Sequence, residues 1–148
     1  NVETSRMARL GGEFAVLMLV TLPESHYEGL EKALEGLAER GYKLTMTPTE
    51  HSHEESYPGW RGYRIELEGA DHEGIVHRVA QHLSRRGISI TTMETETSLA
   101  PFGGVTLFNM TARVVIPAHL EDEDWHTGLA AIGDEMNLEI RVEPEEGE

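Results

Sequence analysis

The chain has 148 residues, enough for one ordinary domain or two small ones, and its 39% hydrophobic content is typical of globular rather than disordered proteins. It contains no cysteine, which excludes disulfides, thiolate metal sites and cysteine nucleophiles. A net charge of −15 opposes contact with a phosphate backbone, so direct binding to DNA or RNA is not expected. With no export signal and no run of about 18 apolar residues, we expect a cytoplasmic protein outside the membrane.

The sequence begins with the pattern of a β-hairpin. Residues 2–9 alternate weakly between polar and apolar side chains, and Gly11 and Gly12 mark a tight turn. Residues 14–20 form a continuous apolar run, which is typical of a strand that is buried on both faces or nearly so. We therefore expect residues 2–9 to pair with the strand that follows the two glycines.

A helix and a short strand should follow the hairpin. Ser25 and Glu28 have the spacing of a capping box, in which a hydroxyl and a carboxylate satisfy free amides at a helix start. Apolar residues then recur at helical spacing through 30–38, and Gly41 provides a left-handed terminator. Residues 42–47 have the pattern of a short strand.

A polar segment over 48–60, rich in Pro, Ser and Glu, separates two parts of the chain. We place the boundary within it, giving one unit at 1–57 and a second at 58–148. The second part carries six further elements with strand or helix periodicity. They are a strand at 63–67, a helix at 75–83, strands at 88–99 and 105–116, a helix at 125–136 and a strand at 138–142.

The order of elements at 2–47 recurs at 88–142, which indicates two copies of one supersecondary unit. The second copy opens with an additional strand and helix at 61–86 that the first copy lacks. We expect this gap to be filled, either by residues that precede Asn1 in the natural protein or by a neighbouring chain or domain.

The complete unit reads β-α-β-β-α-β, an order that gives an α+β, ferredoxin-like fold. Such a unit has a four-stranded antiparallel sheet with both helices on one face. The first unit should be the same fold, incomplete at its N-terminus. In the second unit five apolar side chains should pack on the sheet: Ile75, Val79, Leu83, Leu129 and Ile132.

The segment from Gly69 to Val76, which reads G-A-D-H-E-G-I-V, resembles the opening of an ACT domain, and Gly87 and residues 88–90 behind it fit the same pattern. The sequence departs from that pattern at His72, Glu73 and Ser89. The segment Leu107–Met110 is similar to the family's third strand. Two such units in tandem, together with residues 5–14, resemble the glycine cleavage system transcriptional repressor group.

The resemblance implies a regulatory protein that binds a small ligand, usually an amino acid, on the strand-to-helix loop. The residues that it assigns to this loop are Gly69, Asp71, His72, Gly74, Ile75 and Val76. Glycine lets the backbone approach a ligand, and a helix start offers free amides to a carboxylate. The resemblance further implies action through a protein such as a transcriptional activator. We expect no cofactor, and the unpaired strand edges of the incomplete first unit indicate a homo-oligomer.

Plainer readings of the same residues stay open. Asp71 can cap the helix that follows it, and His72 can be an exposed loop residue. Gly69 and Gly74 can be turn residues first and ligand contacts second. The histidines and carboxylates at 51–55 lie in a polar linker without the rigid scaffold that a metal site needs.

No hydrolase, zinc-protease or phosphate-loop pattern occurs, so an enzyme is not expected. The acidic run at 121–124 has the composition of a calcium loop without its spacing, and suits the positive end of a helix dipole. The alternative function is an interaction module that dimerises through sheet edges and binds no metabolite.

Overall fold

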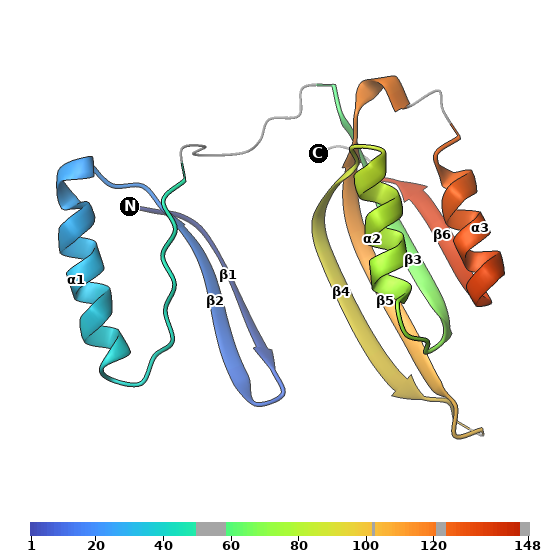
Figure 1. The fold of residues 1–148 in the computed structure, drawn as a ribbon, viewed down its shortest axis with the longest axis horizontal. Coiled ribbons are helices and arrows are strands. Elements are labelled where there is room, and N and C mark those ends of the chain that lie inside the picture. The colour runs from blue at the N-terminus through green and yellow to red at the C-terminus, as the bar shows by residue number, and fades with distance from the viewer. Residues whose placement is uncertain (50–58, 102, 121–123, 146–148) are drawn as a thin grey trace. The chain divides into compact units, whose positions relative to one another are not determined.

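The computed structural model describes residues 1–49, 59–101, 103–120 and 124–145, and the chain separates into two compact units, residues 1–55 and 56–148 (Figure 1). The domain boundary that the sequence predicts at 57/58, most of the linker, and the histidines at 51–55 fall outside the described residues. The boundary therefore stays a prediction. None of the described helices combines the length and apolar composition that a membrane span requires.

The second unit has the predicted β-α-β-β-α-β order, with a short 3-10 turn before its second helix. Its elements are β3 (Arg61–Ala70), α2 (Ile75–Arg85), β4 (Ser89–Leu99), β5 (Thr106–Ile116), η2 (Ala118–Leu120), α3 (His126–Met136) and β6 (Leu138–Pro144). The strands form one antiparallel sheet in the order β4-β5-β3-β6. Both helices cover the same face of this sheet (Figure 1), which confirms the ferredoxin-like prediction.

The core of the second unit lies between that face and the two helices. The five side chains predicted to pack there are all buried, from 0% exposure for Leu83 to 7% for Ile132. Alternate residues of β5 complete the core, because successive side chains of a strand point to opposite faces. Each fully buried aliphatic side chain stabilises the fold by about 1.5 to 3 kcal/mol. Periodicity alone therefore identified the packed face.

The first unit opens with the predicted hairpin of β1 (Val2–Leu10) and β2 (Glu13–Val20). The two strands pair antiparallel, with Leu10 opposite Glu13 at the turn. Gly11 and Gly12 have φ angles of 56° and 89°. A two-residue hairpin turn of this kind needs positive φ at both positions, which glycine adopts without steric cost.

The predicted capping box is wrong. The 3-10 turn η1 (Glu24–His26) precedes α1 (Tyr27–Ala38), so Ser25 lies inside a turn of helix rather than in front of it. The amide of His26 donates to the carbonyl of Pro23 at 2.8 Å, and the start of α1 has no side-chain cap. Neither η1 nor α1 has a side-chain cap, so the hydroxyl of Ser25 does not have the role that the sequence assigned to it.

Residues 42–47 do not form the predicted strand. The complete unit supplies the reason, since its last strand, β6, pairs with β3 alone. The first unit contains no element equivalent to β3 among its described residues, so residues 42–47 have no strand to pair with. A strand is stabilised by its ladder of hydrogen bonds, and a suitable sequence is not enough without a neighbour.

The prediction that the apolar strand of the first unit is buried on both faces is also wrong. No residue within 1–49 is buried, and in β2 Leu17 is 76% exposed and Phe14 65%. The physical reason is the small number of elements around it, because β1 and α1 together leave most of the hairpin uncovered. Apolar side chains of the strand β2 are thus exposed in the first unit, whereas the matching side chains of β5 are buried in the core of the second unit.

Candidate functional site

The loop that joins β3 to α2 follows the last paired residue of β3. Ala70 lies opposite Leu107 of β5, and one residue later the amide of Asp71 donates to the carbonyl of Thr106 at 2.9 Å. The β3–β5 ladder therefore fixes the first half of the loop, and only residues 71–74 leave the sheet. The loop is anchored at one end by the central strand and at the other by α2.

The start of α2 has no side-chain cap. Gly74 is its N-cap residue, with a φ of 86° that only glycine adopts readily, and the first intrahelical bond runs from the amide of Arg78 to the carbonyl of Gly74. The amides of residues 75–77 precede that bond, so they have no acceptor within the helix. A helix start with free amides attracts anions, because the helix dipole adds positive potential there.

The alternative reading of Asp71 as a helix cap is therefore not supported. The N-cap position belongs to Gly74, and no side chain makes a capping hydrogen bond there. Asp71, His72 and Glu73 are all exposed. Their side chains make no hydrogen bond or ion pair with the described part of the chain, which leaves them available to a ligand.

The two glycines of the motif have different roles. At Gly69 a side chain would collide with Leu138, at 2.6 Å from its Cδ2, and with the carbonyl oxygen of Asn137 at 3.0 Å. Gly69 is thus required by the packing of β3 against the turn into β6. At Gly74 nothing lies within 4 Å of the same position, so the space around the helix start is open.

The last two candidate residues, Ile75 and Val76, also differ in their exposure. Ile75 is 2% exposed and belongs to the core, so its side chain is not free to meet a ligand. Val76 is 37% exposed at the first turn of α2. The loop therefore brings together Asp71, His72, Gly74 and Val76 at an open helix start, while Gly69 and Ile75 hold it in place.

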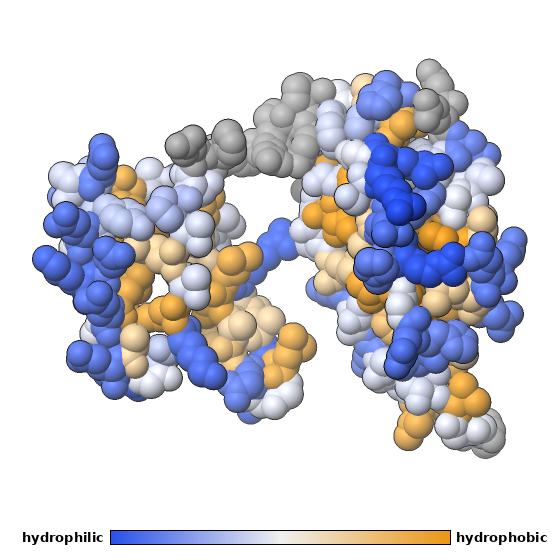
Figure 2. Space-filling view, in the orientation of Figure 1, coloured by the Kyte–Doolittle hydropathy of each residue, from blue (hydrophilic) through white to orange (hydrophobic). Residues whose placement is uncertain are grey.

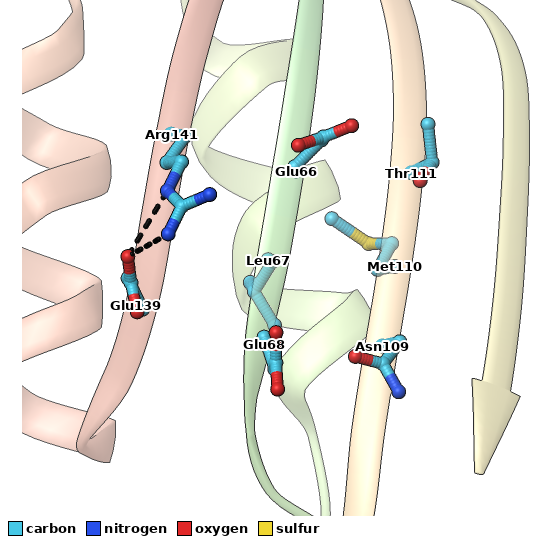
Figure 3. Close-up of a pocket in the computed structure, with 8 residues that line it drawn as sticks. All are labelled: Glu66, Leu67, Glu68, Asn109, Met110, Thr111, Glu139 and Arg141. Atoms are coloured by element: carbon cyan, nitrogen blue, oxygen red, sulfur yellow. Dashed lines mark hydrogen bonds and ion pairs between the residues drawn. The ribbon is translucent and has the colours of Figure 1, made fainter.

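A second concave region, which sequence reasoning missed, lies on the face of the sheet away from the helices (Figure 3). Eight residues of β3, β5 and β6 line it: Glu66, Leu67, Glu68, Asn109, Met110, Thr111, Glu139 and Arg141. Its charge is negative, with three carboxylates against one guanidinium. The sequence does carry a signal for this region, because glutamates alternate along β3 and alternate residues of a strand share one face of the sheet.

Arg141 is the single cation of this depression. Its guanidinium donates to Glu139, which the two dashed lines in Figure 3 show, and that hydrogen bond raises the pKa of Arg141 above its ordinary value. The charges of Glu139, Glu66 and Glu68 act in the same direction. The face is exposed and already partly neutralised, so it offers a weaker binding site than the open helix start.

No group of three or more histidine, aspartate or glutamate side chains within the described ranges is arranged to hold a metal ion. His82 is occupied in packing, with its Nε2 at 3.2 Å from the carbonyl oxygen of Trp125. The acidic run that precedes α3 lies outside the described residues from 121 to 123.

The chain matches one family model and several solved structures. Residues 1–47 match the family model for the ACT domain. The matched residues are the incomplete first unit, whereas the motif at 69–76 lies in the second. No curated protein matches the chain at a significant level.

Among solved structures, an unknown protein from Galdieria sulphuraria is 39% identical, with a TM-score of 0.81, over 99% of this chain and 82% of its own. A protein assigned provisionally as a glycine cleavage system transcriptional repressor has a TM-score of 0.70 at 16% identity, over the same shares of the two chains. The second likeness shows that both units share that protein's fold.

Proposed function

Because residues 1–47 match the ACT-domain family model, we propose that the chain is an amino-acid-sensing regulatory protein of ACT-type units whose ligand binds at the loop of residues 69–76 in the second unit. The ACT-domain match supports a regulatory role. The ligand class and the binding site are the new parts. We further propose that the protein acts in the cytoplasm as a homo-oligomer, through contact with a protein such as a transcriptional activator.

The observation that carries the proposal is the uncapped start of α2. Its first amides have no acceptor within the helix, Gly74 supplies no side chain to block them, and the neighbouring space is open. An amino-acid carboxylate accepts hydrogen bonds from such amides and gains from the helix dipole, about 0.3 to 1 kcal/mol at an exposed site.

The remaining loop residues are suited to bind the ammonium group and the side chain of an amino acid. Asp71 is exposed, and its carboxylate is suited to pair with the ammonium group that an α-amino acid carries on the carbon next to its carboxylate. His72 lies beside it and can donate or accept a hydrogen bond. Val76 offers an apolar surface one residue into the helix. The ligand class is therefore a zwitterion rather than a simple anion.

The net charge of the chain supports action through a protein partner. A chain with a net charge of −15 gains nothing from counterion release on DNA, so control of transcription would need a DNA-binding protein as intermediary. In a titration of the chain with labelled duplex DNA at physiological salt, we expect no binding. Tight binding by the isolated chain would contradict this part of the proposal.

The alternative is an interaction module that binds no metabolite. Two features favour it. The strand β4 is an edge strand of its sheet, and its last residue, Leu99, is 73% exposed, while Val105 in the turn that follows is 50% exposed. Unpaired strand edges with apolar neighbours promote association between chains. This reading predicts oligomerisation that no amino acid changes.

A thermal shift measurement against the twenty amino acids separates the two functions. The sensor predicts a saturable rise in melting temperature with at least one of them, because a ligand of the native state stabilises it by mass action. Gly74→Val should abolish the rise. Gly87→Val is a matched control, because Gly87 also has positive φ and open space around it, but at the far end of α2. No shift across the panel would favour the interaction module.

A further inference from the structure

We propose that the first unit binds a second copy of this chain through the face of its hairpin that the fold leaves open. We call this surface the hairpin face, and its apolar side chains are Ala8, Leu10, Ala15, Leu17 and Leu19. The inference rests on the homo-oligomer of the proposed function and assigns a surface to it. It does not involve the amino-acid site at the start of α2.

The register of the hairpin places these side chains together. Three directly opposed pairs of β1 and β2 form consecutive rows on this face: Leu10 and Glu13, Ala8 and Ala15, Arg6 and Leu17. Opposed residues of an antiparallel pair share a face, and so do alternate residues along each strand. Leu10 is 77% exposed and Leu17 76%, and Figure 2 shows apolar side chains at the surface of the hairpin. Two strongly exposed leucines therefore lie on the same face.

The complete unit shows which face of the fold this is. Pro23 directly precedes η1 as Pro117 precedes η2, so β2 can be matched to β5 residue by residue from this point. Leu17 then matches Thr111, which lies on the face of the sheet away from the helices. Both helices of the complete unit cover the other face (Figure 1). Among its described elements, none covers the face that matches the hairpin face.

The two units differ in the chemistry of this face. In the second unit Asn109 and Thr111 of β5 lie beside the glutamates of β3 (Figure 3), and Arg113 continues the row along β5. The matching residues of β2 are apolar: Ala15, Leu17 and Leu19. The solvated face of an antiparallel sheet normally carries polar side chains, so the fold does not explain the leucines. An exposed apolar face of this kind marks a protein–protein contact.

Charge identifies the occupant as a second copy. Arg6 and Glu13 are the charged residues of the three rows, and neither makes an ion pair with the described part of the chain. They have opposite sign and lie in the rows on either side of Ala8 and Ala15. When two copies face each other with a two-fold axis through the alanine row, the Arg6 row of each copy lies over the Glu13 row of the other. The surface is therefore complementary to itself.

The open sheet face of the second unit is a poor partner for the hairpin face. It carries Glu66, Glu68 and Glu139 (Figure 3), and carboxylates lose their water without compensation when apolar side chains pack against them. In a pair of hairpin faces, by contrast, the central alanines let the two sheets approach. Leu10 and Leu17 of both copies are then removed from water.

The test measures dimerisation of the full chain by sedimentation equilibrium. Leu17→Glu should raise the dimer dissociation constant at least about 100-fold, because each copy then buries a carboxylate among apolar side chains. Thr111→Glu is the matched control, because it places the same charge at the matching position of the second unit, and it should leave the constant unchanged. Both variants should keep the far-UV circular dichroism of the original chain, since neither Leu17 nor Thr111 is buried.

A charge exchange tests the two-fold arrangement independently of the leucines. Arg6→Glu should weaken the dimer about tenfold, because the glutamate row of each copy then meets a like charge. The double variant Arg6→Glu/Glu13→Arg should restore the dissociation constant to within about threefold of the original value, because the opposite charges are again paired across the axis.

Four results would overturn the inference. A chain that is monomeric at every concentration contradicts it together with the proposed homo-oligomer, and leaves the amino-acid thermal shift as a separate question. A dimer that Leu17→Glu does not weaken forms through another surface. A dimer that Thr111→Glu weakens equally responds to the overall charge of the chain. A double charge variant that dimerises no better than Arg6→Glu contradicts the two-fold pairing.

Discussion

The imidazole of His82 on α2 lies directly against Gly128 on α3, so closely that no side chain larger than hydrogen fits at position 128. The same imidazole contacts the carbonyl oxygen of Trp125 through Nε2. The His82 ring therefore packs between α2 and the start of α3, the two helices that cover the sheet. It links the helix that carries the candidate site to the helix that closes the core.

The substitution Gly128→Ala should destabilise the second unit by about 1 to 3 kcal/mol, because the added methyl group forces the His82 ring out of its position. Urea unfolding followed by tryptophan fluorescence measures the loss. The double variant His82→Ala/Gly128→Ala should recover part of it, since the ring is then absent. If Gly128→Ala alone is as stable as the original chain, the helix contact is looser than the structure indicates.

The stability of the second unit should fall as the solution becomes acidic. Burial lowers the pKa of His82, the nearby Arg86 charge lowers it further, and the hydrogen bond to the Trp125 carbonyl opposes both. Because the pKa is lower in the folded state, the unfolded chain binds more protons below its own histidine pKa. The contribution of neutral His82 is then complete above about pH 6.5 and is lost as pH falls through the folded value.

The measurement is the free energy of unfolding of the original chain and of His82→Gln at several pH values from 8 to 5. The original chain should lose more stability than the variant over this range, because only it carries the half-buried imidazole. Equal slopes for the two proteins would remove His82 as the cause.

Gly69→Ala and Gly74→Ala should destabilise the protein for different reasons. At Gly69 the methyl group meets Leu138 and the backbone of Asn137, and we expect a loss of about 1 to 3 kcal/mol. At Gly74 only the positive φ is unfavourable, which costs about 1 to 2 kcal/mol. Adding Leu138→Ala should reduce the effect of the first substitution relative to Leu138→Ala alone, and should not alter that of the second.

Asp71→Asn should weaken amino-acid binding by about tenfold, which corresponds to 1.4 kcal/mol for the loss of one ionic hydrogen bond. Glu73→Gln is the matched control, because it removes an equally exposed charge two residues away. Isothermal titration with the amino acid that gives the largest thermal shift measures both. Equal losses in the two variants would show that the loop acts through its overall charge and that Asp71 does not pair with the ammonium group.

The complete unit could be predicted from the sequence because its pattern is local. Val79 and Leu83 recur at helical spacing, alternate residues of β5 are apolar, and glycines stand at the ends of the elements. Each feature depends on neighbours in the chain, and together they fix a single element order. The hairpin at Gly11 and Gly12 was predicted for the same reason.

The failed predictions depended on partners elsewhere in space. Residues 42–47 have strand composition, but a strand needs a neighbour that the described first unit does not contain. Ser25 has the right spacing for a cap, but the chain tightens into a 3-10 turn around it. Gly69 fitted a ligand loop in sequence, yet its lack of a side chain is explained by Leu138, distant in the chain. Contacts of this kind have no local signature.

The most direct test of the amino-acid site is a ¹H–¹⁵N NMR titration of the full chain with the amino acid that stabilises it. We predict that the largest saturable shift changes fall on the amides of Gly74, Ile75 and Val76, with smaller changes at Asp71 and His72. If saturable changes instead fall on β4 or on the open face around Glu66 and Arg141, or if no amino acid produces any, the site assigned to the start of α2 is wrong.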